Sequence, residues 1–308
     1  MSVVLIFLNE ERFLTEAVQS VCGQTLTDWE LVLVDDGSTD ASTRIALGFA
    51  ASDPRIRYLD HPGHRNCGMA ASRNLGATHT SAPYLAFLDG DDIWQPTKLA
   101  DQVHLLEQMP DVAMVNGALL YWFSWDPQAT AEDNNVLTGG VADRRLEPPE
   151  LALTIYPLGP GDGAGVDLLV RRTVFDAVGG FEERFRGMFE DQSFLLKVFL
   201  RYPVYISSRY WILYRQHDAS ECARTSPAEY LRARSGFLDW LSDDSQDISD
   251  ARVATAVRRA RRQVRISTFT APVTNAVAML RQRIPERFKE PVRRIRRRSR
   301  SRSLSSGH

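Results

Sequence analysis

Three acidic residues follow a short apolar run in the stretch "FLDGDDIW", residues 87–94. Carboxylates as close as Asp89, Asp91 and Asp92 repel one another unless something neutralises them. The turn is solvated, or Asp92 caps a helix that begins near Pro96, or the acids bind a divalent cation. Asp-x-Asp lets two carboxylates reach one Mg²⁺ or Mn²⁺, and such an ion often completes its shell with substrate phosphates. A metal diphosphate would therefore relieve the repulsion at this turn.

Two further acidic pairs each have two explanations. Asp35 and Asp36, in "VDDGSTD", form an Asx-turn with a helix cap, or they accept hydrogen bonds from a ribose or a base. Glu190 and Asp191 precede an amphipathic segment, where acids stabilise a helix start or, in a cleft, provide a general base. Neither pair is specific by itself.

Two basic side chains accompany these acids. Arg73 lies in the helical segment "GMAASRNLGA", where it faces solvent or pairs with the acidic clusters. His217 follows an apolar run in "YRQHDAS", and a lone histidine is usually structural. Only the nearby acids make either residue a candidate for function.

Strands and helices that alternate along the chain must position these residues. Continuous apolar runs predict strands buried on both faces, and apolar residues at helical spacing predict helices between them. Such alternation predicts a parallel sheet covered by helices on both faces, with ligands beyond the carboxyl ends of its strands. Strands are predicted at residues 3–8, 30–35, 55–61, 84–89, 112–117, 166–172 and 211–217. Helices are predicted at 12–24, from a cap at Ser38 or Asp40 to about 51, at 68–77, 96–109, 173–178 and 191–201, and over much of the chain after 227. Residues 125–165, rich in Pro, Gly, Asp and Asn, are predicted as long loops with one short helix.

Taken together, these pieces resemble the family-two glycosyltransferases with a GT-A fold, over roughly residues 2–220. The matched features are "FLNEERFLTEAVQSVCGQT", "WELVLVDDGSTD", "GMAASRNLGA", "YLAFLDGDDIWQPTKL", "GGFEERF", "FEDQSF" and "YRQHDAS". The resemblance implies an α/β fold of GT-A type, with a Rossmann-like, mostly parallel central sheet, helices on both faces and a helical C-terminal extension. It divides the chain into a nucleotide-sugar-binding half (1–125), an acceptor-side half of the same domain (126–226), the helical extension (227–290) and a basic tail (291–308) that we expect to be disordered.

The resemblance also implies a role for each acidic candidate. Asp36 reads the nucleoside. Asp91 is the closer ligand of the cation, and Asp89 lies nearer the ribose while sharing the metal. Asp191 is the catalytic base, so it must be ionised at the working pH.

The resemblance also assigns three other residues. Arg73 contacts the nucleotide, and His217 occupies a position that in some relatives helps to hold the metal or diphosphate. Of the Pro-Thr/Ser-Tyr/Phe-Asn turn of the family only Asn9 is present, because residues 6–8 read Ile-Phe-Leu. Backbone contacts to the base can survive this change, but side-chain contacts from Thr or Tyr cannot.

The implied function is an inverting, metal-dependent glycosyltransferase of hexosyltransferase type. It moves one sugar from a nucleotide-diphosphate donor, a UDP-sugar being the expected one, to a hydroxyl of a glycan or lipid-linked acceptor in cell-surface polysaccharide or glycolipid assembly. The expected cofactor is Mn²⁺ or Mg²⁺. The chain lacks the Gln-x-x-Arg-Trp motif of processive members, which indicates one sugar per encounter. The alternative is a catalytically idle GT-A-like module that binds nucleotide or glycan, against which the intact Asp89, Asp91 and Asp191 argue.

Composition limits where the chain works. Its three cysteines are odd in number and far apart, which predicts no disulfide framework and favours a reducing compartment. No apolar run approaches the ~20 residues that span a bilayer, and no basic region precedes the first apolar run. We therefore expect a cytoplasmic protein, with peripheral contact on the inner face of the membrane as an option.

That option comes from an uneven charge. Residues 251–308 contain 16 Arg and 1 Lys against 2 Glu, a net +15, whereas residues 1–250 contain 20 basic and 37 acidic residues, a net −17. Val253, Val257, Ala260 and Val264 recur at helical spacing among the arginines. Such a helix lies on an anionic membrane or packs on the acidic domain. Nucleic acid is not an expected partner, because no aromatic or fold signal accompanies the basic run.

If residues 251–302 contact membrane, truncation after Ser249 should release the protein from anionic vesicles while donor hydrolysis is retained. Co-sedimentation with vesicles measures the release. Unchanged vesicle binding by the truncated chain would contradict the membrane contact.

Overall fold

The computed structural model describes residues 1–163, 165–243 and 250–283, with side chains described up to residue 268. Residues 1–261 form one compact unit, and residues 262–308 are assigned to a second. The predicted boundaries near residues 125, 226 and 290 stay predictions.

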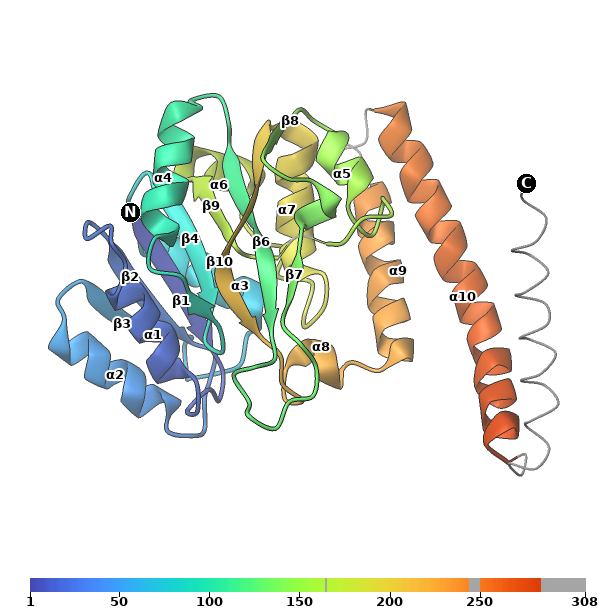
Figure 1. The fold of residues 1–308 in the computed structure, drawn as a ribbon, viewed down its shortest axis with the longest axis horizontal. Coiled ribbons are helices and arrows are strands. Elements are labelled where there is room, and N and C mark those ends of the chain that lie inside the picture. Colours follow the sequence, from blue (N-terminus) through green and yellow to red (C-terminus); the bar gives the residue numbers. More distant parts are fainter. Residues whose placement is uncertain (164, 244–249, 284–308) are drawn as a thin grey trace, which may run out of the picture. The chain divides into compact units, whose positions relative to one another are not determined.

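A mixed sheet forms the centre of the first unit (Figure 1). Within the described residues, six strands share one direction: β1 (Ser2–Phe7), β2 (Glu30–Asp35), β3 (Ile56–Asp60), β4 (Tyr84–Asp89), β6 (Met114–Trp122) and β10 (Val204–Arg215). The strands that pair antiparallel to these are β5 (Ile93–Trp94), β7 (Asn134–Val136), β8 (Arg144–Leu146) and β9 (Leu168–Arg171). The order is β3-β2-β1-β4-β9-β6-β10-β5, with β7 beside β6 and β8 beside β10. The predicted mostly parallel sheet is confirmed.

Helices connect the strands and lie on both faces of the sheet (Figure 1). The helices of the described residues are α1 (Leu14–Cys22), α2 (Ser42–Ser52), α3 (Met69–Thr78), α4 (Lys98–Gln108), the 3-10 turn η1 (Thr138–Gly140), α5 (Glu150–Thr154), α6 (Arg172–Val178), α7 (Glu190–Arg201), α8 (Glu221–Arg224), α9 (Pro227–Asp243) and α10 (Ala251–Arg283). The N-cap of α2 is Ala41, which has no side-chain cap, rather than Ser38 or Asp40 as predicted. Asp40, one residue earlier, accepts a hydrogen bond from the backbone N–H of Ser42 (2.9 Å). Gly179 ends α6 in the left-handed region, as its sequence predicts.

Strand β1 is buried along its whole length because it has strands on both sides and helices on both faces. Leu5 and its neighbours on one face pack with α1 and α4 in the main apolar cluster. On the other face α3 lies so close that a Cβ on Gly76 would be 2.3 Å from Cγ1 of Val4. Only glycine permits this approach, which brings Arg73, one turn earlier in α3, toward the sheet.

Aromatic side chains fill the space between β4 and the helices α6 and α7. The ring of Phe87 in β4 lies 5.0 Å from Phe181 and 5.7 Å from Phe175, measured between ring centroids. Phe181 in turn lies 4.6 Å from Phe194 of α7. This packing places the first turn of α7 beside the end of β4, and the side chains of α7 predicted to face inward are all buried: Phe194, Leu195, Val198 and Phe199.

The structure differs from the prediction in the middle of the chain. Residues 125–165 contain the one short helix predicted there, α5, but also the strands β7 and β8. Both strands are three residues long and mostly polar, so no apolar alternation marks them, and their pairing depends on distant partners. Strand β10 begins at Val204 rather than near 211, because a register irregularity between Ile206 and Ile212 carries the strand through the polar residues 207–209.

The helices predicted after residue 227 are present as α9 and α10. In the first turns of α10 the apolar residues Val253, Val257 and Ala260 are buried, and Arg261 forms an ion pair with Asp239 of α9 (2.6 Å). For residues 251–261 the structure therefore favours packing over exposure of this face to a membrane. Membrane contact through residues 251–302 stays a prediction, and residues 284–302 lie outside the described part of the chain.

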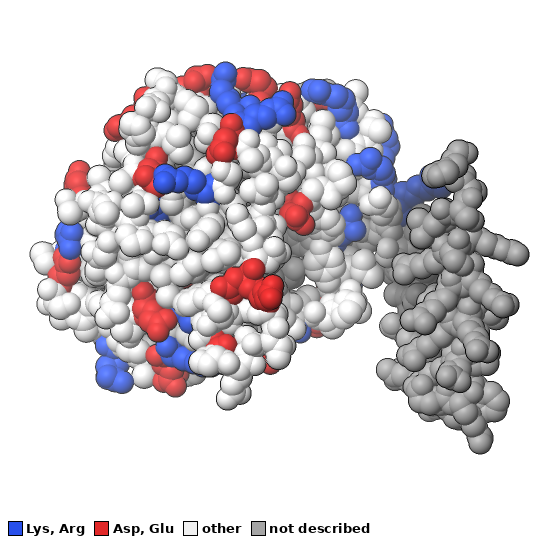
Figure 2. Space-filling view, in the orientation of Figure 1, with Lys and Arg blue, Asp and Glu red and all other residues white. Residues whose placement is uncertain are grey.

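Two further observations concern the surface. Among the described residues no helix is both long and apolar enough to cross a bilayer. On the face shown in Figure 2, acidic and basic side chains are interspersed. The negative charge of residues 1–250 is thus not gathered into a single patch on that face.

A buried ion pair that the sequence did not indicate joins α4 to the far half of the sheet. The fully buried Lys98 bonds Asp167 and Gln102 and lies 4.9 Å from the ring centroid of Trp94. The second carboxylate oxygen of Asp167 accepts the backbone N–H of Trp211 (3.3 Å). Burying a charge is costly unless it is paired, so removal of either partner leaves an uncompensated charge.

Lys98→Met should lower the free energy of unfolding by about 3–5 kcal/mol, because it strands the Asp167 carboxylate in the core. Adding Asp167→Asn should recover part of that loss, since both charges are then gone. Urea unfolding followed by circular dichroism measures both. Lys197→Met is the control, because its partner Glu182 is partly exposed; a loss no larger than that of the control would contradict the proposed weight of the Lys98 pair.

Candidate active site

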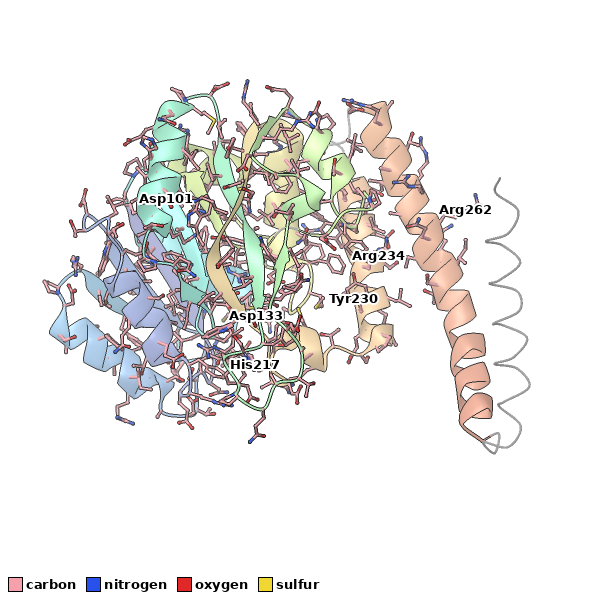
Figure 3. All side chains as sticks on the ribbon, in the orientation of Figure 1. Asp101, Asp133, His217, Tyr230, Arg234 and Arg262 are labelled. Atoms are coloured by element: carbon pink, nitrogen blue, oxygen red, sulfur yellow. The ribbon has the colours of Figure 1, made fainter. Side chains whose placement is uncertain are left out.

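The predicted site residues meet at one edge of the sheet. Strands β1, β2, β4 and β10 run in the same direction, so their carboxyl ends face one edge. Asn9 and Asp36 follow two of these ends, and Asp89 ends β4. His217, labelled in Figure 3, lies just beyond β10. Asp191 belongs to the first turn of α7.

The carboxylate of Asp36 is buried and bonded to backbone. Its two oxygens accept the N–H groups of Cys67 (2.7 Å) and Gly68 (3.0 Å), which fixes the turn that leads into α3. The neighbouring Asp35 makes the Asx-turn, accepting the N–H of Ser38 (2.7 Å). Both carboxylates of this pair thus bind backbone N–H groups of nearby turns, and nucleoside recognition by Asp36 stays a prediction.

Asn9 joins two loops at the same edge. It lies in the left-handed region (φ 58°), and its side-chain oxygen accepts the N–H of Thr39 (2.7 Å). Its own N–H donates to the hydroxyl of Ser38 (3.0 Å). The side chain of Asn9 therefore shapes the loop after β1, which fits a contribution to base binding through backbone rather than side chain.

Asp91 and His217 lie together although 126 residues separate them. Nε2 of His217 is 3.0 Å from Oδ2 of Asp91, and the two side chains are 9% and 17% exposed. Asp89, 27% exposed, is bonded on its other side by Nη2 of Arg73 (2.7 Å). The predicted metal residues are thus adjacent, with one basic partner for each carboxylate.

Arg73 is not a solvent-facing helical residue. It is 1% exposed, and its guanidinium bridges Asp89 to Glu190 (3.3 Å) at the start of α7. The guanidinium carbon also lies 5.3 Å from the ring centroid of Phe181. Of the two alternatives for Arg73, the ion pair is confirmed; a contact with the nucleotide stays a prediction.

Burial changes the acidity of the pair that begins α7. Burial raises the pKa of Asp191 above its ordinary value, although the charge of Arg73 opposes the rise. Burial, and next the charge of Asp191, raise the pKa of Glu190 to about 8. A carboxylate with a raised pKa accepts a proton more readily than an ordinary aspartate, which suits a general base.

Glu10 is a site residue that the sequence reasoning missed. Burial, followed by the charges of Asp91, Asp40 and Asp89, raises its pKa to about 8. The side chain of Glu10 passes Gly90, and a Cβ added to Gly90 would be 3.3 Å from Cγ of Glu10. Its position directly after Asn9, at the end of a buried strand, was the signal available in the sequence.

The prediction that Asp92 caps a helix is wrong. Helix α4 begins at Lys98, and the buried Asp92 instead accepts the backbone N–H of Arg215 (2.8 Å). Arg215 is a second missed residue: its Nε donates to the backbone oxygen of Asp91 (2.7 Å), and its Nη2 donates to Glu16 (2.6 Å). The turn "DGDD" is thus held to β10 by backbone and side-chain bonds that come from distant parts of the chain.

The residues at this edge fit a divalent cation that shares its ligands with a substrate. Carboxylate oxygens suit Mn²⁺ or Mg²⁺, and after burial it is the charges of Asp91, Asp40 and Asp89 that raise the pKa of Glu10. Among the described residues, no group of three or more His, Cys, Asp and Glu side chains is arranged to hold a metal ion. A cation bound here would need further ligands beside Asp89, Asp91 and His217, and donor phosphates commonly supply them at Mg²⁺ sites.

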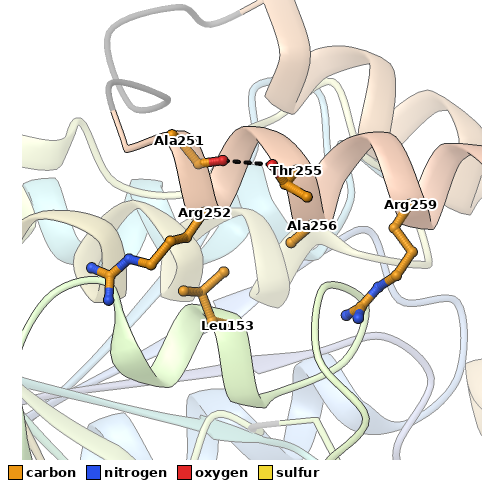
Figure 4. A pocket seen from close by; sticks show the side chains of 6 residues that line it. All are labelled: Leu153, Ala251, Arg252, Thr255, Ala256 and Arg259. Carbon is orange, nitrogen blue, oxygen red and sulfur yellow. Dashed lines mark hydrogen bonds between the residues drawn. The ribbon is translucent and has the colours of Figure 1, made fainter.

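A cavity of about 530 Å³ lies elsewhere in the first unit, between α5 and the start of α10 (Figure 4). None of the acids described above lines it, and the hydroxyl of Thr255 on its wall is bonded to the backbone oxygen of Ala251 (2.8 Å). Its lining residues are Leu153, Ala251, Arg252, Thr255, Ala256 and Arg259. This cavity is therefore separate from the candidate active site.

Glu10→Gln should stabilise the metal-free protein at alkaline pH. A carboxyl whose pKa rises from 4.5 to about 8 on folding costs stability as pH rises through that window. After allowance for its partial exposure, the gain at roughly pH 8.5 should be about 1 kcal/mol, or about 2–4 °C in Tm. No gain is expected near pH 5. Thermal melts in EDTA, with the exposed Glu107→Gln as control, measure it; an equal gain at both pH values would contradict the assignment.

Comparison with known proteins identifies a family for the first part of the chain. Residues 2–126 match the model described as Glycosyl transferase family 2. The putative glycosyltransferase EpsE of Bacillus subtilis is 37% identical over 120 residues, which are 39% of this chain and 42% of that protein. An uncharacterized glycosyltransferase of Rickettsia prowazekii is 26% identical over 247 residues, covering 79% of this chain and 73% of that protein.

Solved structures show the same fold at low identity. TarS of S. aureus, residues 1–349 in complex with UDP-GlcNAc, has a TM-score of 0.61 at 18% identity and covers 77% of this chain and 65% of that chain. The mannosyltransferase PcManGT of Pyrobaculum calidifontis, in complex with GDP-Man and Mn²⁺, has a TM-score of 0.58 at 14% identity, with 99% and 81% covered. Residues 2–126 therefore resemble glycosyl transferase family 2, and the chain has the GT-A type fold of these solved glycosyltransferases.

Proposed function

We propose that this chain is a metal-dependent, inverting glycosyltransferase of hexosyltransferase type, which moves one sugar per encounter from a nucleotide-diphosphate donor to an acceptor hydroxyl. One observation carries the proposal. Asp89, one of the candidate metal carboxylates, is joined through the buried Arg73 to Glu190, which immediately precedes the candidate base Asp191. Groups for the leaving diphosphate and for the attacking hydroxyl thus lie on either side of one guanidinium.

The donor class has support from the structural neighbours. TarS was solved with UDP-GlcNAc and PcManGT with GDP-Man and Mn²⁺, both of them nucleotide-diphosphate sugars. We propose a UDP-sugar as the donor and Mn²⁺ or Mg²⁺ as the cofactor. For the acceptor we propose a glycan or a lipid-linked sugar in cell-surface polysaccharide or glycolipid assembly, received on the side of residues 126–226.

The chain's own residues account for the transfer. Asp191 takes the proton of the acceptor hydroxyl, and the oxygen attacks the anomeric carbon on the face opposite the leaving diphosphate, which inverts its configuration. The bond from that carbon to the diphosphate oxygen breaks, and the electron pair leaves with the nucleoside diphosphate. A bound divalent cation would supply Lewis-acid stabilisation of that leaving group. Asp89, Asp91 and His217 would hold that cation and so place the diphosphate end, and fixing both reactants supplies much of the remaining acceleration.

Two single substitutions should separate donor binding from chemistry. With Mn²⁺, but not with EDTA, one of UDP, GDP, dTDP or CMP should raise Tm; a ligand at ~100 times its dissociation constant stabilises by about 2.7 kcal/mol. Asp91→Asn should abolish that shift, because it removes a cation ligand. Asp191→Asn should keep the shift but slow transfer by about 10²–10⁴-fold, because the base is lost.

Asp28→Asn, an exposed change before the amino end of β2, is the control and should alter neither quantity. If no nucleotide shifts the melt of the wild type under any condition, the acids form a structural turn and a catalytically idle module becomes the better explanation. If Asp191→Asn transfers sugar at the wild-type rate, another residue is the base.

A further inference from the structure

The imidazole of His217 is held in place on two sides. Its Nε2 lies 3.0 Å from Oδ2 of Asp91. Its ring centroid lies 5.1 Å from that of Phe13, at an interplanar angle of 58°, and 6.5 Å from that of Trp125, at 90°. The side chain cannot swing away from Asp91 without leaving these rings.

Trp125 also fixes the backbone that carries His217. Its indole N–H donates to the backbone oxygen of Gln216 (2.9 Å), and the N–H of Gln216 donates to the backbone oxygen of Trp122 (3.1 Å). Trp122, at the end of β6, and Trp125, in the loop after it, therefore bind the N–H and the C=O of Gln216, directly before His217. Trp125 is half-buried and lies on a segment predicted to be loop.

Arg215 supplies the third constraint, two residues before His217. Its backbone N–H donates to the carboxylate of Asp92 (2.8 Å), and its Nε donates to the backbone oxygen of Asp91 (2.7 Å). Its Nη2 donates to Glu16 of α1 (2.6 Å). The side chain is 3% exposed. Its guanidinium carbon lies 4.4, 4.6 and 5.2 Å from the ring centroids of Phe13, Trp122 and Trp125.

These contacts converge on one place. Arg215 is the register partner of Trp122 across the parallel strands β6 and β10, so both loops leave the sheet at the same level. Apart from the bond of Arg215 to Glu16, its hydrogen bonds end on the Asp91–Asp92 turn, and that of the Trp125 indole ends on Gln216, next to His217. The rings of Phe13 and Trp125 lie beside both the imidazole of His217 and the guanidinium of Arg215.

We propose that Trp125 and Arg215 are positioning residues that hold the His217 imidazole on Oδ2 of Asp91, which leaves Oδ1 of Asp91 as the oxygen for the cation. This inference rests on the proposed function, because it assigns the orientation of a metal ligand. Neither residue touches the reacting atoms. Trp125 acts through His217 and the backbone of Gln216, whereas Arg215 holds the turn that carries Asp91.

A double-mutant cycle on Mn²⁺ affinity tests the proposal. Trp125→Phe keeps an aromatic ring but removes the N–H bond to Gln216, and it should weaken Mn²⁺ binding about 3- to 10-fold in the presence of saturating UDP. His217→Ala should weaken binding at least as much. If Trp125 acts through His217, Trp125→Phe should add little in the His217→Ala background. Free Mn²⁺ measured by electron paramagnetic resonance gives the four affinities, with whichever diphosphate stabilises the wild type replacing UDP where UDP does not bind.

Trp29→Phe is the matched control. Trp29, directly before β2, is also buried, and within the described residues its indole N–H has no hydrogen-bond partner. Trp125→Phe should lower the metal-free Tm no more than this control does, whereas its Mn²⁺ affinity alone should fall. Arg215→Lys, which removes the donor to the Asp91 backbone oxygen, serves in the same cycle if Trp125→Phe does not fold.

The outcomes separate this inference from the proposed function. Unchanged Mn²⁺ affinity in Trp125→Phe, or losses that add fully with those of His217→Ala, would overturn the positioning role. Full Mn²⁺ affinity in His217→Ala would overturn it too while leaving the proposed function intact. A wild type that binds no Mn²⁺ with any nucleoside diphosphate would overturn both.

Discussion

Negative charge concentrated at one sheet edge is the constraint on which the rest of the structure depends. Asp89, Asp91 and Asp92 end β4 or follow it, Glu10 follows β1, and the acids of α7 face them. Buried carboxylates are tolerated only with partners. The chain provides two buried guanidinium groups, one on each side of the turn: Arg73 from α3 and Arg215 from β10.

These two arginines connect the turn to different elements of the fold. Arg73 connects the turn to α7, so the spacing between the metal carboxylates and the candidate base depends on one side chain. Arg215 connects the same turn to α1 and to a cluster of aromatic rings, so the far side of the turn is set by β10. A fixed arrangement of this kind gives a binding site its geometry before the substrate arrives.

Much of the fold follows from sequence pattern. Buried parallel strands read as unbroken apolar runs, and β4 was predicted to the residue because Tyr84 opens its run and Asp89 closes it. The short strands β5, β7 and β8 escaped prediction because two or three residues carry no period, and their partners lie far along the chain. The direction of β9 was likewise not encoded locally.

In the site, the acidic residues could be identified from the sequence by their type and spacing, but the basic groups that neutralise them could not. Arg215 looks like any strand residue until the parallel register of β6 and β10 brings it to Asp91, and Asp92 was given to a helix because a local cap is the commoner use of such a residue.

Gly76 touches no candidate ligand, yet the electrostatics of the site depend on it. Its missing side chain sets the depth at which α3 rests on Val4 and Val34, and therefore how far the Arg73 guanidinium reaches along the sheet. A larger residue there would act as a wedge, lifting the helix and withdrawing positive charge from between Asp89 and Glu190. The observable defect would resemble the loss of a charged group although no charge had been altered, so variation at this buried glycine would be mistaken for damage to the catalytic machinery.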